Sequence, residues 1–409
     1  MRKIKEISLC LALVSVLSTM LIPWNNAFAV NTNALFVWSS SVETAAEAHE
    51  NTTETIEVAE TAESTNQNSL NLESTSAILM DQKSGNILYE HNIHEQLRPA
   101  SVTKVMTMLL IMEAIESGQI SLEDPVPVSE TARSMGGSQI WLNENETLSV
   151  HEMLKAITVV SANDASVAMA EFISGTEGTF VEKMNSRARD LGMNNTVFKN
   201  SHGIDEDGHL TTAYDIAIMS RELMESHPTI AEYSTIWMDS LRGGASELVN
   251  TNKLVRTYDG ITGLKTGSTS ISLFNLSATA TRSDLSLIAV IMRAETSVVR
   301  FNEVRKLLDY GFANFEYSTF STAGELVRTI DVEKGISTTV DVVFEIDNGT
   351  LVEKGTGGNI SSSVELSELA SAPITQGQVL GVAIYTMDNV EVRKNQSSCR
   401  FRCKKTYFP

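Results

Sequence analysis

Cysteine is scarce in this sequence, and its placement limits what a disulfide can do. Of the 409 residues only Cys10, Cys399 and Cys403 are cysteines. Domains that depend on disulfides have several cysteines spread through the fold. Here the two C-terminal residues either bridge each other or stay free, and neither state supports the rest of the chain. A hydrophobic core must therefore hold the fold, and a hydrophobic content of 42% is sufficient for one.

Positive charge is also scarce. The chain has 31 Lys and Arg against 51 Asp and Glu, which gives a formal net charge of −20. Proteins that bind nucleic acid carry basic surfaces, so this composition argues against nucleic acid as a partner. His151-Glu152 lacks the second histidine of a zinc-binding helix, and no glycine-rich phosphate loop is present. We therefore predict neither a metal nor another cofactor.

Long apolar runs are absent except for one near the N-terminus. Basic residues at positions 2, 3 and 5 precede an apolar run over 7–22, and Ala27-Phe28-Ala29 follows it. This pattern is typical of a secretory signal peptide, so we predict that residues 1–29 are removed and that the protein is exported. The alternative is a membrane anchor, but the run is short beside the roughly 20 residues that span a bilayer.

Two further segments differ in composition from a folded domain. Residues 30–72 are rich in Glu, Thr, Ser, Asn and Ala and contain no Lys or Arg. Such a segment buries little apolar surface, so we predict a disordered acidic spacer. Residues 394–409 are basic. We predict a tail there, for which weak contact with an anionic membrane surface remains open.

The pattern between these segments predicts an α+β fold. Apolar stretches predict strands at 77–80 and 87–89, and a region of strands from about 250 to 293 that includes 264–268, 273–281 and 285–292. Helical spacing predicts helices near 101–117, 150–157, 165–173, 179–191, 212–224 and 298–315. Strands at both ends with helices between them indicate an antiparallel sheet flanked by helices, plus an all-helical subregion, over 73–318. Short β segments over 319–393 predict a small all-β domain.

Ser101 and Lys104 stand three residues apart at the start of an apolar helix. Positions i and i+3 share a helix face, so the lysine ammonium can stand over the serine hydroxyl. Ser101 is expected in the first turn, where free N–H groups and the helix dipole favour negative charge. The alternative is a helix-capping serine beside a solvated lysine, because roughly one or two such pairs occur by chance in a chain this long.

Two more motifs follow in order. Ser161-x-Asn163 lies in a predicted break between helices, and Lys265-Thr266-Gly267 lies on a predicted strand. Ser-x-Asn alone is weak, since residues 64–66 and 69–71 also match it. Lys-Thr-Gly occurs once. The ordered set, with each member in a suitable element, is a far stronger signal than any single motif.

Together the motifs supply the groups that acyl transfer requires. Ser101 can attack, and Lys104 can accept its proton if burial and the nearby charge of Lys265 lower the lysine pKa. Ser161 can relay a proton to the leaving nitrogen. Asn163 can hold both Lys104 and a substrate amide, because its side chain donates and accepts.

The strand that carries Lys265 suits the other end of a peptide substrate. Lys265 and Thr266 can bind a carboxylate, and Gly267 lets a substrate backbone lie close to the strand edge. The backbone N–H groups of Ser101 and Ser268 are the expected oxyanion donors.

These motifs resemble those of the penicillin-interacting serine enzymes. More closely, the chain is similar to the low-molecular-mass penicillin-binding proteins, the serine-type D-alanyl-D-alanine carboxypeptidases. The stretches that carry this resemblance are residues 98–107, 161–165, 195–203 and 263–267. Two departures stand out: Ala162 where glycine is usual, and Ile271-Ser272-Leu273-Phe274 in place of an Ala-Gly-aromatic step. The second departure bears on local strand packing.

The resemblance implies a β-lactamase/transpeptidase-like catalytic domain that acts outside the cytoplasm. It implies removal of the terminal D-alanine from the pentapeptide stem of peptidoglycan through an acyl-enzyme on Ser101. It also implies that β-lactam antibiotics inhibit the enzyme at the same serine and that Arg300 helps to bind the substrate carboxylate. A solvated helix position is the alternative for Arg300.

Two other functions stay open at this point. A serine β-lactamase shares the three motifs, but class A enzymes use a glutamate to activate the deacylating water. Between Asn163 and Lys265, Glu182 and Glu247 each stand three residues before an asparagine, so the sequence leaves this alternative open. A non-catalytic wall-associated protein with a relict site is the other alternative, although every motif residue is intact.

Overall fold

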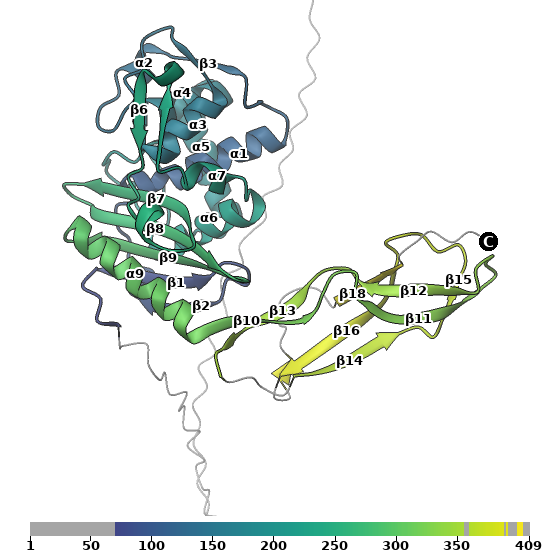
Figure 1. Ribbon diagram of the computed structural model, residues 1–409. Helices are drawn as coiled ribbons and strands as arrows, with labels where there is room; N and C mark the ends of the chain where they lie inside the picture. Colours follow the sequence, from purple (N-terminus) through teal and green to yellow (C-terminus); the bar gives the residue numbers. More distant parts are fainter. Residues whose placement is uncertain (1–69, 356–359, 388–389, 392–398, 404–409) are drawn as a thin grey trace, which may run out of the picture. The chain divides into compact units, whose positions relative to one another are not determined.

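The computed structural model describes residues 70–355, 360–387, 390–391 and 399–403. The predicted signal peptide, nearly all of the acidic spacer and most of the basic tail lie outside these residues. The predicted α+β class is confirmed, with an antiparallel sheet, flanking helices and a C-terminal all-β part (Figure 1). Among the described residues no helix combines the length and apolarity needed to cross a bilayer.

One five-stranded antiparallel sheet organises the N-terminal part. Its strands are β1 (Ser76–Asp81), β2 (Ile87–His91), β7 (Ile261–Thr269), β8 (Leu273–Arg282) and β9 (Leu285–Ala294), in the spatial order β2-β1-β9-β8-β7. Strand β1 pairs with β9, so the sheet joins segments about 200 residues apart, as predicted. The long insertion between β2 and β7 supplies most of the helices.

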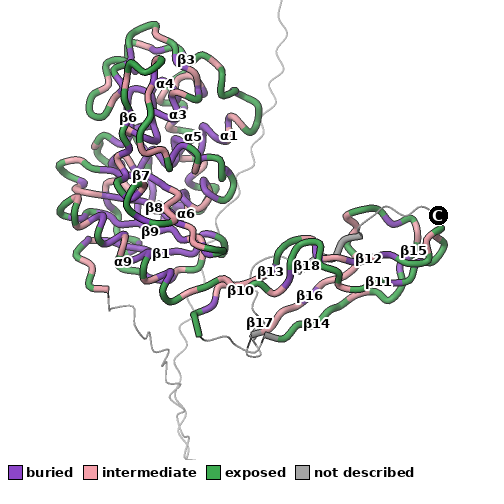
Figure 2. The backbone as a smooth tube through the Cα atoms, in the orientation of Figure 1, coloured by how far each residue is buried: buried purple, intermediate pink, exposed green. Residues whose placement is uncertain are grey.

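Alternating side chains place a separate core on each face of the sheet. Ile78 and Met80 of β1 pack into one core, and Ala77 and Leu79 pack into the other. Helix α9 (Ser297–Asn314) covers the second face. Helix α6 (Ala213–Ser226) covers the first, where it meets α1 (Lys104–Glu116). Figure 2 shows that the backbone of these central strands and of α1 is largely buried.

Helix α1 is buried on all sides rather than on one stripe. Its residues from Lys104 to Met112 are all buried, which fits a helix that other elements surround. The other helices of the insertion are α2 (Glu130–Arg133), α3 (Val150–Val159), α4 (Asn163–Ser174), α5 (Glu177–Asp190), α7 (Ile230–Ser234) and α8 (Leu254–Thr257). Contacts of α1 with α3, α4, α5 and α6 make it the centre of the helical subregion.

Capping residues fix where these helices begin. The Thr176, Thr212 and Thr296 hydroxyls each accept from a backbone N–H three residues later, at the starts of α5, α6 and α9. Ser149 and Glu152 form a reciprocal capping box at the start of α3. The helix starts are therefore readable from the sequence, and they place the ends of α3 and α4 next to α1.

The structure corrects three expectations. Ser101 lies in a 3₁₀ turn, η2 (Ala100–Thr103), and the α-helix starts only at Lys104. The predicted strand region beginning near 250 opens instead with α8. The sequence pattern also missed two short hairpins, β3 (Pro125–Pro127) with β4 (Thr147–Ser149) and β5 (Met238–Leu241) with β6 (Ser246–Val249), the latter joined by η3 (Arg242–Gly244). These strands have three or four residues, too few for a period to be visible.

The C-terminal part contains only strands among its described residues. Strand β10 (Phe315–Ser321) pairs with β13 (Asn348–Glu353). A larger sheet has the order β14-β16-β18-β12-β11-β15, with β17 paired to β16. Its strands are β11 (Leu326–Glu333), β12 (Thr339–Phe344), β14 (Ile360–Leu366), β15 (Leu369–Ser371), β16 (Val379–Met387), β17 (Val390–Glu391) and β18 (Cys399–Cys403). Strand β18 uses residues that the sequence analysis assigned to the basic tail.

Leu273, the first residue of β8, has a left-handed backbone with φ of 56°. It belongs to the stretch that departs from the family pattern, where a glycine is usual. A left-handed conformation costs an L-residue about 1–2 kcal/mol, whereas glycine loses only about 0.5–1 kcal/mol of extra backbone entropy.

We expect Leu273→Gly to leave the free energy of unfolding within about 1 kcal/mol of the original value, because relieved strain offsets lost contacts. The matched control is Leu276→Gly in the same strand, where the side chain is fully buried. That variant should lose about 3 kcal/mol or more. Urea denaturation of both variants checks this, and equal losses would refute the strain at Leu273.

Candidate active site

Lys104 is the centre of the site and has no exposed surface (0%). Its Nζ lies 3.1 Å from Ser101 Oγ, 2.6 Å from Asn163 Oδ1 and 2.6 Å from the main-chain oxygen of His202. The two shorter partners can only accept hydrogen bonds. A neutral amine has two N–H groups and one lone pair, so these two oxygens take both N–H groups and the lone pair faces Ser101.

Electrostatics favour this neutral amine. Burial lowers the pKa of Lys104 well below its usual value, and the positive charge of Lys265 lowers it further. The Asp164 carboxylate opposes this shift with a smaller effect. Because Lys104 is fully buried beside Ser101, the solvated-lysine alternative is wrong.

Ser161 and Asn163 come from the junction between α3 and α4. Ser161 has a left-handed backbone with φ of 64°, which ends α3 and turns the chain toward α1. Its buried hydroxyl has no hydrogen-bond partner within the described part of the chain. Asn163 donates from Nδ2 to Gly136 O at 2.7 Å while its Oδ1 accepts from Lys104. The amide thus fixes the lysine and the 136–138 loop together.

Strand β7 supplies the third motif. Lys265 is fully buried and donates from Nζ to Thr266 O at 2.9 Å. Burial lowers the pKa of Lys265 to about 7, and the charge of Arg300 contributes. The Thr266 hydroxyl donates to Thr251 Oγ1 at 2.7 Å. Strand β7 also packs on η2, the turn that carries Ser101 and that we call the nucleophile turn. Ser268 follows directly after the point of contact between β7 and this turn.

Gly267 has a different structural reason from the one the sequence suggested. A Cβ at this position would lie 2.8 Å from Pro99 O, 2.9 Å from Val102 N and 3.0 Å from Ser101 N. Glycine is therefore required for the contact between β7 and η2 inside the protein. The backbone of η2 makes this close approach inside the protein, and the approach of a substrate backbone to Gly267 stays a prediction.

Arg300 lies under β7 and is only 5% exposed, so the solvated alternative is wrong. Its Nη1 donates to Gly267 O at 3.3 Å and to Asn275 O at 3.2 Å, and its Nη2 donates to Ser297 Oγ at 3.2 Å. Burial lowers its pKa to about 10, so it stays charged at neutral pH. Arg300 braces β7 and places a positive charge behind Lys265.

Three contributors were missed at the sequence level. The His202 carbonyl holds Lys104, but a main-chain atom has no signature in a sequence. Asn275 donates from Nδ2 to Arg98 O at 2.9 Å and to Pro99 O at 3.0 Å, which ties β8 to the nucleophile turn. Asp164 accepts from Ile140 N and Leu142 N, each at 3.1 Å from Oδ2. A lone amide in the apolar strand β8 was the one available signal, for Asn275.

The described residues contain no group of three or more His, Cys, Asp and Glu side chains that could hold a metal ion.

Comparison with known proteins matches this geometry to one group of enzymes. The D-alanyl-D-alanine carboxypeptidase family model (peptidase S11) matches residues 60–296, and the model of the penicillin-binding protein 5 C-terminal domain matches residues 315–400. D-alanyl-D-alanine carboxypeptidase DacF of Bacillus subtilis is 41% identical over 340 residues, covering 82% of this chain and 87% of that protein.

Two solved structures extend the comparison. Penicillin-binding protein 5 from Haemophilus influenzae has a TM-score of 0.66 at 31% identity, with 83% of this chain and 98% of that chain covered. Penicillin-binding protein D2 from Listeria monocytogenes in its ampicillin-bound form has a TM-score of 0.55 at 29% identity, covering 59% of this chain and 99% of that chain.

We expect Gly267→Ala to slow acylation by penicillin by about 100-fold, because the new Cβ pushes η2 away from β7 and a shift of about 1 Å can have that effect. Gly178→Ala is the matched control, since Gly178 lies in α5 with its only close neighbour at 3.9 Å. The control should acylate at the original rate. Stopped-flow measurement with a fluorescent penicillin checks both, and a fast Gly267→Ala variant would contradict the packing argument.

Proposed function

This chain belongs to the D-alanyl-D-alanine carboxypeptidase family, and we propose that it releases the terminal D-alanine from the peptidoglycan pentapeptide through an acyl-enzyme on Ser101. One observation supports this most strongly. The fully buried Lys104 amine is held by two acceptors, Asn163 Oδ1 and His202 O, and lies 3.1 Å from Ser101 Oγ. That arrangement supplies a nucleophile and its base without a third ionised partner.

In the first half-reaction, Ser101 Oγ attacks the carbonyl carbon between the two D-alanines while its proton passes to Lys104 Nζ. The N–H groups of Ser101 and Ser268 stabilise the developing oxyanion. The C–N bond then breaks, and the leaving amine takes the proton from Lys104 through the Ser161 hydroxyl. D-alanine departs, and the rest of the stem stays attached to Ser101 as an ester.

Water completes the cycle in the second half-reaction. It attacks the ester carbonyl while Lys104 accepts one of its protons, and the Ser101–acyl bond breaks. The proton returns to Ser101 Oγ, so the enzyme regains its starting state. A β-lactam enters by the same attack on its strained amide, but the leaving group stays tethered to the acyl chain.

Charge behind the strand supports recognition of the terminal carboxylate. Lys265 and Thr266 would bind the substrate carboxylate. The buried Arg300 behind β7 would add a long-range electrostatic attraction to this carboxylate. Burial in a low dielectric strengthens this attraction, because few waters screen it. The enzyme would act outside the cytoplasm, since its substrate is in the cell wall and residues 1–29 predict export. The basic composition of residues 394–409 is what supports a contact of the C-terminal region with an anionic membrane surface.

The nucleophile is tested directly by mass spectrometry. After incubation with penicillin, the original protein should gain one penicillin mass, and Ser101→Ala should gain none, because Ser101 is the hydroxyl that Lys104 contacts in the described part of the chain. Ser134→Ala, at an exposed serine, is the matched control and should be labelled normally. An adduct on Ser101→Ala would overturn the assignment. Release of D-alanine from a pentapeptide confirms the reaction, and rapid turnover of penicillin would indicate a β-lactamase instead.

The pH dependence tests the role of Lys265. Its pKa is about 7, so the side chain loses its positive charge as the pH rises through 7. We expect KM for a pentapeptide to rise between pH 7 and 9, because the carboxylate loses one cationic partner. Lys265→Arg keeps its charge in this range, so its KM should stay flat. Steady-state kinetics at fixed ionic strength provide the measurement, and a flat KM for the original enzyme would contradict this role.

A further inference from the structure

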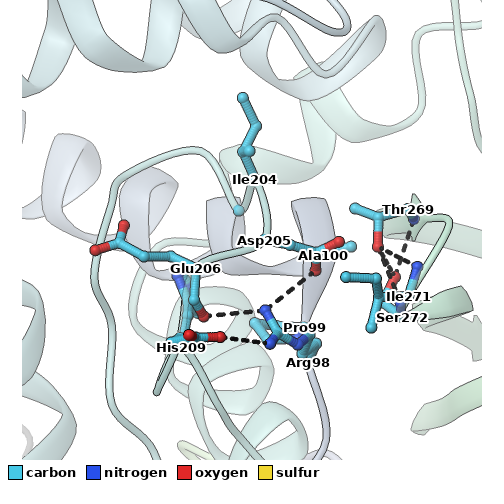
Figure 3. Close-up of polar contacts among 12 residues, drawn as sticks. Arg98, Pro99, Ala100, Ile204, Asp205, Glu206, His209, Thr269, Ile271 and Ser272 are labelled. Atoms are coloured by element: carbon cyan, nitrogen blue, oxygen red, sulfur yellow. Dashed lines mark hydrogen bonds and ion pairs between the residues drawn. The ribbon is translucent and has the colours of Figure 1, made fainter.

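His209 is a buried histidine that none of the steps above uses. It is 2% exposed and comes from the segment between Asn200 and α6, which lies against the nucleophile turn. Its Nε2 lies 2.9 Å from Thr103 Oγ1. Its Nδ1 has no hydrogen-bond partner within the described part of the chain. Figure 3 shows His209 beside Arg98, below the loop that carries Ile204 and Asp205.

The hydrogen bonds of Thr103 determine which nitrogen of His209 carries the proton. Thr103 Oγ1 lies 2.8 Å from Ala100 O, and a carbonyl oxygen can only accept. The single hydroxyl proton therefore goes to Ala100 O. Thr103 Oγ1 must then accept from His209, so Nε2 carries the hydrogen. A relay of two hydrogen bonds runs from His209 through Thr103 to the peptide that precedes Ser101.

That peptide needs external support. Ala100 has a left-handed backbone with φ of 46°, which costs a residue with a Cβ about 1–2 kcal/mol. Such a conformation persists only where its surroundings enforce it. The Ala100–Ser101 peptide sets the direction of the Ser101 side chain and also contains the Ser101 N–H. A small rotation of this peptide therefore moves both the hydroxyl and the N–H of Ser101.

Three contacts enforce this conformation from one loop. A Cβ at Gly203 would lie 2.0 Å from Ala100 O, so the backbones are in close contact there. Arg98 donates from Nη1 to Glu206 O at 3.1 Å (Figure 3). Its Nη2 donates to Asp207 Oδ1, also at 3.1 Å. The His209–Thr103 relay is the third contact. It is the one that bonds directly to the Ala100 carbonyl.

The surroundings of His209 keep its ring uncharged. Its pKa is lowered to about 4, mainly by burial and to a smaller extent by the charges of Arg98 and Lys199. The edge of the ring also packs against Phe198. A neutral ring adds no positive charge beside Lys104 at neutral pH, so the support of the turn does not disturb the base.

We propose that His209 is a positioning residue for acyl transfer, which acts through Thr103 to hold the Ala100–Ser101 peptide in its reactive direction. The inference rests on the proposed role of Ser101 as nucleophile. It assigns to His209 an effect on the rate of attack by Ser101, beyond any contribution to stability.

The sharpest test compares His209→Gln with His209→Asn. A glutamine amide can place an N–H near the position of Nε2, whereas an asparagine amide places it near Nδ1. We expect His209→Asn to lower kcat for a pentapeptide and the rate of penicillin acylation by about tenfold or more, with KM within about twofold. His209→Gln should stay within about threefold of the original enzyme. Rates are normalised to active sites titrated by adduct mass.

A double-mutant cycle tests the relay itself. Thr103→Val should slow acylation as His209→Asn does, and the double variant should lose little more, because both changes break one chain of bonds. Thr103→Ser keeps the hydroxyl and is the matched control, expected to react at nearly the original rate. Additive losses in the double variant would overturn the relay.

The outcomes separate this inference from the proposed function. Acylation of His209→Asn at the original rate per active site, even with a lowered melting temperature, would show a purely structural histidine and overturn the inference alone. A penicillin adduct on Ser101→Ala would overturn the proposed function instead. Equal rates for the Asn and Gln variants, both slow, would also overturn the inference, since it requires rescue by the N–H at Nε2.

Discussion

The burial of one amine, that of Lys104, is the constraint on which this structure depends. Removing a charged ammonium from water costs several kcal/mol, so burial lowers the pKa of Lys104 and favours the neutral amine. That is useful only if its N–H groups still find acceptors, and Asn163 Oδ1 and the His202 carbonyl supply them. Helix α1, the α3–α4 junction and the loop after Phe198 must therefore meet at one point. The all-round burial of α1 follows from this requirement.

The sheet solves the remaining problem of position. Strand β7 lies at one edge of the sheet and packs on η2. Helix α9 covers the face of the sheet opposite the one that α6 covers. Gly267 allows β7 to reach the nucleophile turn, and Asn275 on the neighbouring strand bonds to the same turn. The chain thus fixes Ser101 from strands that are more than 160 residues away in the sequence. Rigid elements of this kind hold a catalytic geometry better than loops do.

The sequence predicted which side chains meet at this site better than the main-chain features that hold them. Side chains such as Ser101, Lys104 and Lys265 have recognisable types and spacing, so their contacts could be anticipated. The His202 carbonyl and the left-handed backbone of Ala100 could not, because main-chain atoms and dihedral angles leave no mark on residue identity. Gly267 was identified, but its reason differed, since the partner it accommodates is distant in sequence. The main helices and strands were predictable from periodicity, whereas the three- and four-residue strands were too short to show one.

The pKa values of the three buried basic side chains of the site decrease from Arg300 to Lys265, in a chain of net charge −20. Arg300, with a pKa of about 10, stays charged; Lys265, at about 7, is near its midpoint at neutral pH. Lys104 lies well below its usual value, because it is buried and also feels Lys265. Each cation lowers the pKa of the next, so the charge remains on the side that would bind a carboxylate. The lowered pKa of Lys104 favours the neutral amine on the side where the serine would lose its proton. In the proposed function, one arrangement of buried basic side chains would therefore serve both binding and catalysis, which a single lysine could not do.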